Sequence, residues 1–403
     1  MKRIAKITVA LLLAVAMCFS LAGCYDEDLN WSAKYDDTEL PAGAYIYYLS
    51  IAYNEAASKV STEGEVLKSE IDGTPAETWI KNRADEYVNQ YFYIQNEMKR
   101  LGLEMTDEDY STCLQTTESY WNYFGTSFEK FGIAKTSFDI AYSQYNRMYL
   151  KVFNALYGEG GENEVPESEL RQHIEDDYYD YEYFSAPLTK TDDDNKSVDL
   201  TDEEKADLKE TLEKYKTKIE SGAMTVNDAA TDYALKVQQD STYQTGIKDE
   251  NGMQSSYMPD AFISAIKEMN EGDVEVVEST KYMIVLHRLP IKDDEDTLLE
   301  SSDNRSQLLL ELKNTEYADA VSAAAQSFEG VEWNQKVLNR YKPSMFADTT
   351  KNGTSSVASE SSDESASSEE SSAESSETSS ETSETSSCLL YTSPSPRDRQ
   401  KSR

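Results

Sequence analysis

Apolar side chains recur at helical spacing through the first part of the chain. One stripe consists of Tyr45, Leu49, Ala52 and Ala56. A longer stripe consists of Ile80, Ala84, Tyr87, Tyr91, Ile94, Met98 and Leu101. Its alternating steps of four and three residues predict a long helix that packs lengthwise against another helix. Trp31–Tyr35 is predicted to form a short strand before these helices. Gly102 is predicted to end the long helix, and Thr106 to cap the next one.

Residues 107–160 continue the helical spacing and are rich in Tyr and Phe. Packed core is the favoured interpretation of these aromatic residues, and a surface that binds another molecule is the alternative. The glycines at 158–161 predict a boundary, since they lack the preceding strand and the following Gly-Lys-Ser/Thr of a phosphate-binding loop. Another helix is predicted over 165–176, with His173 at the surface. Cys113 is expected to be a structural helix residue.

The pattern changes from Asp180 onward. A strand is predicted over 181–188 and a polar loop over 189–200. Thr201 and Glu204 then form a capping box that opens a helix, and Thr225 caps the next helix. The remaining predicted elements are a polar loop over 238–257, a short helix over 258–269, and a hairpin of strands at 274–277 and 282–286. This β-α-α-α-β-β order predicts a compact α+β domain. Helical spacing returns over 302–341.

The N-terminal segment has the composition of a secretory signal. Lys2, Arg3 and Lys6 precede an apolar run that ends in Leu-Ala-Gly-Cys at 21–24. Residues 1–23 are therefore predicted to be a lipoprotein signal peptide, with Cys24 as the acylated first residue of the mature chain. Several acyl chains would anchor that residue to a membrane, because each buried methylene contributes roughly 0.8 kcal/mol. The predicted localisation is extracytoplasmic, on the membrane surface.

The C-terminal segment differs from the rest in composition. Residues 350–387 are almost entirely Ser, Glu, Thr and Ala and contain no aromatic residue. Such a segment cannot bury enough apolar surface to offset its ordering entropy, so 347–387 is predicted to be a disordered tail. Residues 388–403 are instead basic, and 388–398 resemble the translation of a transposase adaptor used in sequencing libraries. We interpret them as an assembly artefact.

Charge and composition exclude several classes of function. The 403 residues contain 38 Lys+Arg and 76 Asp+Glu, a formal net charge of −38. This acidity argues against nucleic-acid binding, which needs a basic face. Two His leave little room for a His-rich metal site or a Ser-His-Asp hydrolase. The acidic runs at 192–194 and 293–296 lack the spacing of an EF-hand loop and are expected to be solvated loops. No cofactor and no metal site is predicted.

Three stretches resemble the SurA/PrsA-type extracytoplasmic foldases. Residues 31–49 resemble the opening strand and helix of that family. Residues 101–109, Leu-Gly-Leu-Glu-Met-Thr-Asp-Glu-Asp, resemble the junction after its long helix. Residues 258–286 resemble the C-terminal half of a parvulin-like (PpiC-type) domain, with its Phe-x-x-Ala helix, Gly-Asp turn and final strand pair. With the C-terminal helices, the similar layout spans about 310 residues.

This resemblance implies an α+β organisation in which a small domain is inserted into a helical one. Residues 24–164 would form a mainly helical SurA N-like chaperone domain. Residues 165–292 would form the parvulin-like domain, and the helices of 293–346 would pack on the N-terminal domain. The implied function is a membrane-anchored foldase or chaperone for unfolded or nascent secreted polypeptides, with weak or absent peptidyl-prolyl isomerase activity.

The resemblance also implies a candidate proline pocket. Met258 and Phe262 match the Met and Phe with which parvulins grip a proline ring, and four-residue spacing would place them on one helix face. Parvulins carry two His as well. Those positions fall here near Phe184 and at Met283, after Tyr282, and His287 lies too far along the chain to substitute. The candidate pocket residues are Met258, Phe262, Tyr282, Met283 and Phe184.

Two alternatives remain open from the sequence. One is a solute-binding lipoprotein, which would show repeated βαβ units with parallel strands. The other is a structural or adhesion lipoprotein in which the acidic tail is a spacer. Ordinary core packing is likewise an alternative role for Met258 and Phe262.

Overall fold

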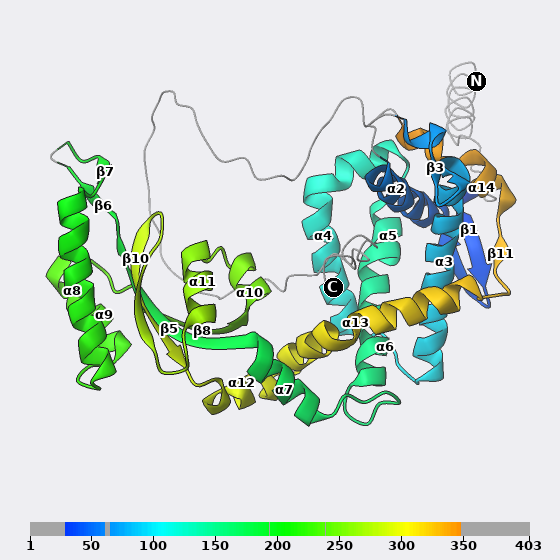
Figure 1. The fold of residues 1–403 in the computed structure, drawn as a ribbon. Helices are drawn as coiled ribbons and strands as arrows, with labels where there is room; N and C mark the ends of the chain where they lie inside the picture. Colours follow the sequence, from blue (N-terminus) through cyan, green and yellow to red (C-terminus); the bar gives the residue numbers. More distant parts are fainter. Residues whose placement is uncertain (1–28, 61–64, 193, 238, 348–403) are drawn as a thin grey trace, which may run out of the picture. The chain divides into compact units, whose positions relative to one another are not determined.

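The computed structural model describes residues 29–60, 65–192, 194–237 and 239–347. The predicted signal peptide, Cys24, the acidic tail and the final basic segment lie outside these residues. The described chain forms two units (Figure 1), one from residues 29–149 and 315–347 and the other from residues 150–314. Two helices, α6 (Tyr145–Tyr157) and α13 (Ser302–Gln326), contain the points of division. None of the helices in the described ranges is long and apolar enough to cross a membrane.

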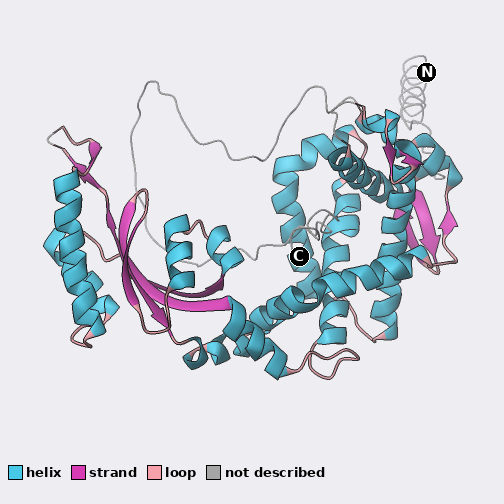
Figure 2. Ribbon diagram, viewed as in Figure 1, coloured by secondary structure: helices cyan, strands magenta, loops and turns pink. Residues whose placement is uncertain are grey.

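The first unit is mainly helical and has a small sheet (Figure 2). Its helical elements are α2 (Ala42–Lys59), η2 (Val66–Lys68), α3 (Ala76–Arg100), α4 (Asp107–Lys130), α5 (Lys135–Phe138), the π-helical η3 (Asp139–Gln144), the start of α6, the end of α13, α14 (Gln335–Arg340) and η5 (Pro343–Phe346). Its strands are β1 (Trp31–Tyr35), β2 (Thr38–Pro41), β3 (Glu70–Ile71), β4 (Thr74–Pro75) and β11 (Glu332–Trp333). β1 lies between β11 and β2, antiparallel to both. The strand predicted at 31–35 is confirmed, and the C-terminal segment contributes to the same sheet.

Helices α2 and α3 carry the two predicted apolar stripes and pack against each other. Every residue of the α2 stripe is buried, and so are the α3 stripe residues from Ile80 to Met98 apart from the half-buried Tyr87. Gly102, with a φ of +67°, follows the end of α3. The Leu103 N–H donates to Met98 O at 2.8 Å, and the Gly102 N–H to Lys99 O at 3.2 Å. These two bonds form a Schellman motif, which requires a left-handed residue at this position.

The second unit contains a four-stranded antiparallel sheet in the order β8-β5-β10-β9. Its strands are β5 (Tyr178–Pro187), β8 (Gln244–Asp249), β9 (Val274–Glu278) and β10 (Tyr282–Leu289), with a separate hairpin of β6 (Thr189–Thr191) and β7 (Ser197–Asp199). Its helical elements are the end of α6, α7 (Glu167–Asp177), α8 (Asp202–Glu220), α9 (Val226–Val237), α10 (Glu250–Ser255), α11 (Asp260–Glu268), η4 (Ile291–Asp293), α12 (Glu295–Glu300) and the start of α13. Residues of α8 and α9 share one core cluster with the sheet, and residues of α10 and α11 share another. The α+β class is confirmed.

Several predicted boundaries in this unit are wrong. The polar loop predicted over 238–257 contains β8 and α10, and the loop predicted over 189–200 contains the β6–β7 hairpin. β8 is an edge strand with no fully buried residue, so its sequence lacks the alternation that marks a strand. The helix predicted from Met258 begins at Asp260, because Pro259 occupies the N-cap position. The capping positions of Thr201 and Thr225 are confirmed.

Candidate functional site

The sheet of the second unit separates the predicted proline-pocket residues. Phe184 and Met283 belong to the buried cluster that includes α8 and α9. Phe262 belongs to the cluster that includes α11, and Met258 packs against that cluster. Tyr282 is 41% exposed at the start of β10. The structure therefore brings Met258 and Phe262 together but places Phe184 and Met283 in the other cluster. Side chains alternate between faces along a strand, so a one-residue shift in an alignment reverses the face.

Tyrosines that the sequence analysis did not select surround Phe262. The rings of Tyr181 and Tyr183 both meet the Phe262 ring edge to face, at centroid distances of 5.2 Å. Phe262 is 0% exposed and Tyr181 is 1% exposed. Phe262 is thus packed inside the core cluster on this side of the sheet. The available signal was the alternation of tyrosines at 179, 181 and 183, which places all three on one face of β5.

His287 takes part in a polar network on the face of the sheet that carries Phe184. It lies opposite Glu182 in the β10–β5 pairing, and its Nδ1 is 2.9 Å from Glu182 Oε1. Tyr243 donates its hydroxyl proton to Glu182 Oε2 at 2.8 Å. Burial raises the pKa of Glu182, but the hydrogen bonds from His287 and Tyr243 outweigh burial and hold that pKa below its usual value. Since Phe262 lies in the other cluster, this network is not positioned to assist chemistry there.

His173 is more buried than predicted. Its side chain is 14% exposed and lies between two carboxylates, Asp177 and Glu311. Nδ1 is 2.8 Å from Asp177 Oδ2, and Nε2 is 2.9 Å from Glu311 Oε2. His173 is half-buried, and it lies among acids as predicted, and the first part of α13 supplies one of them, Glu311, in the same unit. A polar cavity of about 490 Å³ adjoins these residues. Across the described ranges, no cluster of three or more His, Cys, Asp or Glu is arranged to hold a metal ion.

The exposed large apolar side chains of the first unit, within the described residues, all belong to α4. Four of its side chains are exposed: Tyr110 by 45%, Leu114 by 57%, Tyr123 by 84% and Phe124 by 46%. Helical geometry places Tyr110, Leu114 and Phe124 on one side of the helix and Tyr123 about 100° around from Phe124. We call these four residues together the α4 apolar face. Half-buried rings extend it, since Phe124 lies 6.3 Å from the Tyr120 ring and 6.2 Å from the Phe128 ring. Large contiguous apolar patches on monomers mark sites of interaction, so α4 is the candidate element for such a site in the first unit.

The fully buried residues of α4 are small or polar. Half-buried rings complete its packing, since Tyr120, Trp121 and Phe128 contact the buried Phe138 ring at centroid distances of 5.1–6.1 Å. The buried residues of α4 are Asp109, Cys113, Thr117 and Gly125. Arg147 Nε contacts Asp109 Oδ1 at 2.5 Å, and Thr117 donates to Asp139 Oδ1 at 2.7 Å. Gly125 is required because a Cβ there would lie 2.6–2.9 Å from the Trp121 ring. The exposed aromatic residues of α4 are Tyr110, Tyr123 and Phe124. The alternative interpretation of the aromatic spacing, a binding surface, fits these three. Core packing fits the buried Phe138 and Tyr142 and the half-buried α4 rings that contact them.

The solved structures to which this chain is similar include three foldase proteins. The chain is similar to the foldase protein PrsA from Streptococcus pneumoniae, with 13% identity and a TM-score of 0.33 over 64% of this chain and 92% of that chain. It is similar to PrsA from Lactococcus lactis, with 14% identity and a TM-score of 0.33 over 79% of this chain and 98% of that chain. It is also similar to PrsA from Bacillus subtilis, with 14% identity and a TM-score of 0.28 over 65% of this chain and 86% of that chain. No family model and no curated protein matches the chain.

Proposed function

We propose that this protein is an extracytoplasmic chaperone that holds unfolded secreted polypeptides. The α4 apolar face carries the proposal. Aromatic and aliphatic side chains exposed on a helix bind apolar segments of many sequences, because their contacts are non-directional. The net charge of −38 keeps such a protein soluble despite this face and repels acidic polymers.

Membrane attachment is part of the proposal. The Leu-Ala-Gly-Cys sequence at 21–24 supports acylation of Cys24. The anchored chain would then meet clients close to the membrane that they have crossed. Labelling with a fatty-acid analogue, compared between the natural chain and Cys24→Ala, tests this step. Label on the natural chain alone is the expected result, and equal labelling of both would contradict it.

We also propose that residues 165–292 form a parvulin-like domain that does not catalyse prolyl isomerisation. Catalysis would require a pocket that favours the twisted X–Pro amide, whose barrier is about 18–20 kcal/mol. Tyr181 and Tyr183 fill the space beside Phe262, which supports a binding or spacing role for this domain. A protease-free isomerisation assay on the mature chain and on Phe262→Ala should show equal, uncatalysed rates. Activity that the variant loses would contradict this part of the proposal.

A solute-binding role has less support. Such proteins are built from parallel βαβ units, whereas every strand pairing in the described ranges is antiparallel. The chaperone role is therefore the function that we test first.

The decisive experiment removes the α4 apolar face without removing the helix. A variant with Tyr110→Gln, Leu114→Gln, Tyr123→Gln and Phe124→Gln keeps strong helix formers at exposed positions. We expect it to lose most of its suppression of client aggregation at equimolar ratio, while its circular dichroism and melting temperature stay unchanged.

A matched control replaces exposed apolar residues of the second unit. Leu235 and Tyr257 are 74% and 94% exposed, so Leu235→Gln with Tyr257→Gln removes comparable surface elsewhere. This control should suppress aggregation as the natural chain does. Equal activity of both variants and the natural chain would refute the role of the α4 apolar face.

A further inference from the structure

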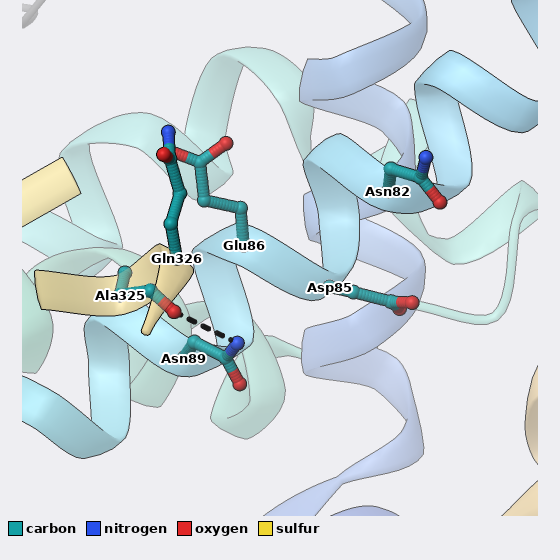
Figure 3. A pocket seen from close by; sticks show the side chains of 6 residues that line it. All are labelled: Asn82, Asp85, Glu86, Asn89, Ala325 and Gln326. Atoms are coloured by element: carbon teal, nitrogen blue, oxygen red, sulfur yellow. Dashed lines mark hydrogen bonds between the residues drawn. The ribbon is translucent and has the colours of Figure 1, made fainter. Parts of the chain in front are cut away.

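A polar cavity of about 370 Å³ lies in the first unit, between α3 and the C-terminal end of α13 (Figure 3). Its lining residues are Asn82, Asp85, Glu86 and Asn89 from α3, and Ala325 and Gln326 from α13. The α3 residues are spaced by three, one and three positions, so they lie on one side of that helix. The cavity is separate from the α4 apolar face.

Two buried oxygen atoms at this cavity lack a donor. Asp85 Oδ1 and Asn89 Oδ1 are both buried and have no hydrogen-bond partner among the described residues. The amide of Asn89 is held in place because its Nδ2 donates to Ala325 O at 3.0 Å. A buried acceptor without a donor is destabilising, because it has lost its hydrogen bonds to water. A ligand that donates N–H groups would restore them.

The electrostatics of the cavity favour a cation. Asp85 supplies a carboxylate, and α13 presents its C-terminal end, which carries the negative end of the helix dipole. The second carboxylate, Glu86, is paired with Arg83 and accepts a hydrogen bond from Ser322. The basic groups nearby are already paired. Arg83 bonds to Glu55 and Glu86 at 2.9 and 3.0 Å, and Lys81 bonds to Glu77 at 2.9 Å. Acceptors are therefore in excess around the cavity.

We propose that this cavity binds an organic cation, an ammonium or guanidinium group, with Asp85 and Asn89 as acceptors. Several N–H donors on one positive centre match the two oxygen atoms that lack partners. The volume admits a group larger than a bare ion. The group could belong to a free small amine or to a Lys or Arg side chain of a bound polypeptide, and the two sources share this chemistry.

Calorimetric titration of the mature chain tests the site directly. The probes are n-butylammonium and n-butylguanidinium at pH 7.5, with butan-1-ol as the neutral analogue. We expect saturable binding of at least one cation at millimolar concentration and none of the alcohol. Asp85→Asn should weaken cation binding at least tenfold, whereas Glu104→Gln, an equal charge change at an exposed position after α3, should leave it within twofold.

A second variant protects the test from loss of stability in Asp85→Asn. Gln326→Lys places a tethered ammonium at the cavity and suits the C-terminal end of a helix. The Gln326→Lys variant should no longer bind the free cation, and its melting temperature should equal that of the natural chain. The site is refuted if neither cation binds better than butan-1-ol, or if Asp85→Asn and Glu104→Gln bind alike.

Two unstructured peptides distinguish the sources of the cation. One contains a single lysine, and the other has norleucine in its place. If the lysine peptide binds more tightly than both n-butylammonium and the norleucine peptide, a side chain of a polypeptide is the source. If it binds only as tightly as n-butylammonium, a free amine is the source. The glutamine variant of the α4 apolar face should bind the cations as the natural chain does, even if it no longer binds clients. The chaperone proposal and the cation-site proposal can therefore fail independently.

Discussion

The successive helices α3 and α4 differ in the residues that they bury completely. They have 25 and 24 residues, and both belong to the first unit. α3 buries large side chains such as Phe92, Ile94 and Met98, whereas the buried residues of α4 are small or polar and several of its large apolar side chains are exposed. In α3 the large apolar residues thus mark the packed side. In α4 the small and polar residues with specific partners mark it.

The largest expected difference between the two helices is in stability. Ile94→Ala in α3 empties a fully buried position and should cost about 2–5 kcal/mol of unfolding free energy. Leu114→Ala in α4 removes a side chain that is 57% exposed and should cost less than about 0.5 kcal/mol. Urea unfolding followed by tryptophan fluorescence measures both. If Leu114→Ala lowered the unfolding free energy as much as Ile94→Ala, the contrast between the two helices would be wrong.

A second prediction concerns the polar attachment of α4. Arg147→Leu takes away a charged partner of Asp109, which is 1% exposed, and should cost about 2–3 kcal/mol. In Arg147→Leu, the rate of backbone amide hydrogen exchange should rise more in α4 than in α3. Lys130→Leu, at an exposed position in the last turn of α4, is the control and should change stability by less than about 0.5 kcal/mol. Unaltered exchange in α4 would mean that other contacts hold this helix.

The smallest expected effect is a pH dependence in α3. Burial raises the pKa of Asp85 to about 6, although Tyr45 hydrogen-bonds to it and Lys81 lies nearby. The folded state then binds more protons than the unfolded state between about pH 4 and 6, so this residue's contribution to stability falls as pH rises through that range. Asp85→Asn should remove about 1–2 kcal/mol of that dependence.

The measurement is the difference in unfolding free energy between the natural chain and Asp85→Asn at pH 4.5 and pH 7.5. Taking the difference cancels the titration of the many other carboxylates. Binding of n-butylammonium should weaken over the same range as pH falls, since protonated Asp85 carries no charge. A difference that does not vary with pH would show that Asp85 titrates normally.

Much of the helical part could be predicted from spacing alone. The α3 stripe, the end at Gly102 and the cap at Thr106 are local features, so the sequence contains them directly. The role of α4 was open because aromatic residues at helical spacing suit both core and surface. The smaller residues Asp109, Cys113 and Thr117, spaced by four, were the signal that identified its packed side.

The sheet of the second unit was harder to predict because its register depends on distant residues. β8 has little alternation of its own and is placed by pairing with β5. The five candidate pocket residues do not all lie together, also because the face of each strand residue was uncertain. Phe184 and Tyr183 are adjacent in sequence but pack in different clusters, so a resemblance aligned to within one residue could not assign the face.

The pairing of β1 with β11 sets an order of folding. Ala33 pairs with Trp333, so the sheet of the first unit joins residues about 300 positions apart. At about 5–20 residues per second, ribosomal synthesis would leave β1 without this neighbour for about 15–60 s. The second unit is one continuous segment and can fold during that interval. The unit that carries the α4 apolar face is therefore completed last, and until then its unfilled sheet edge can pair with other chains.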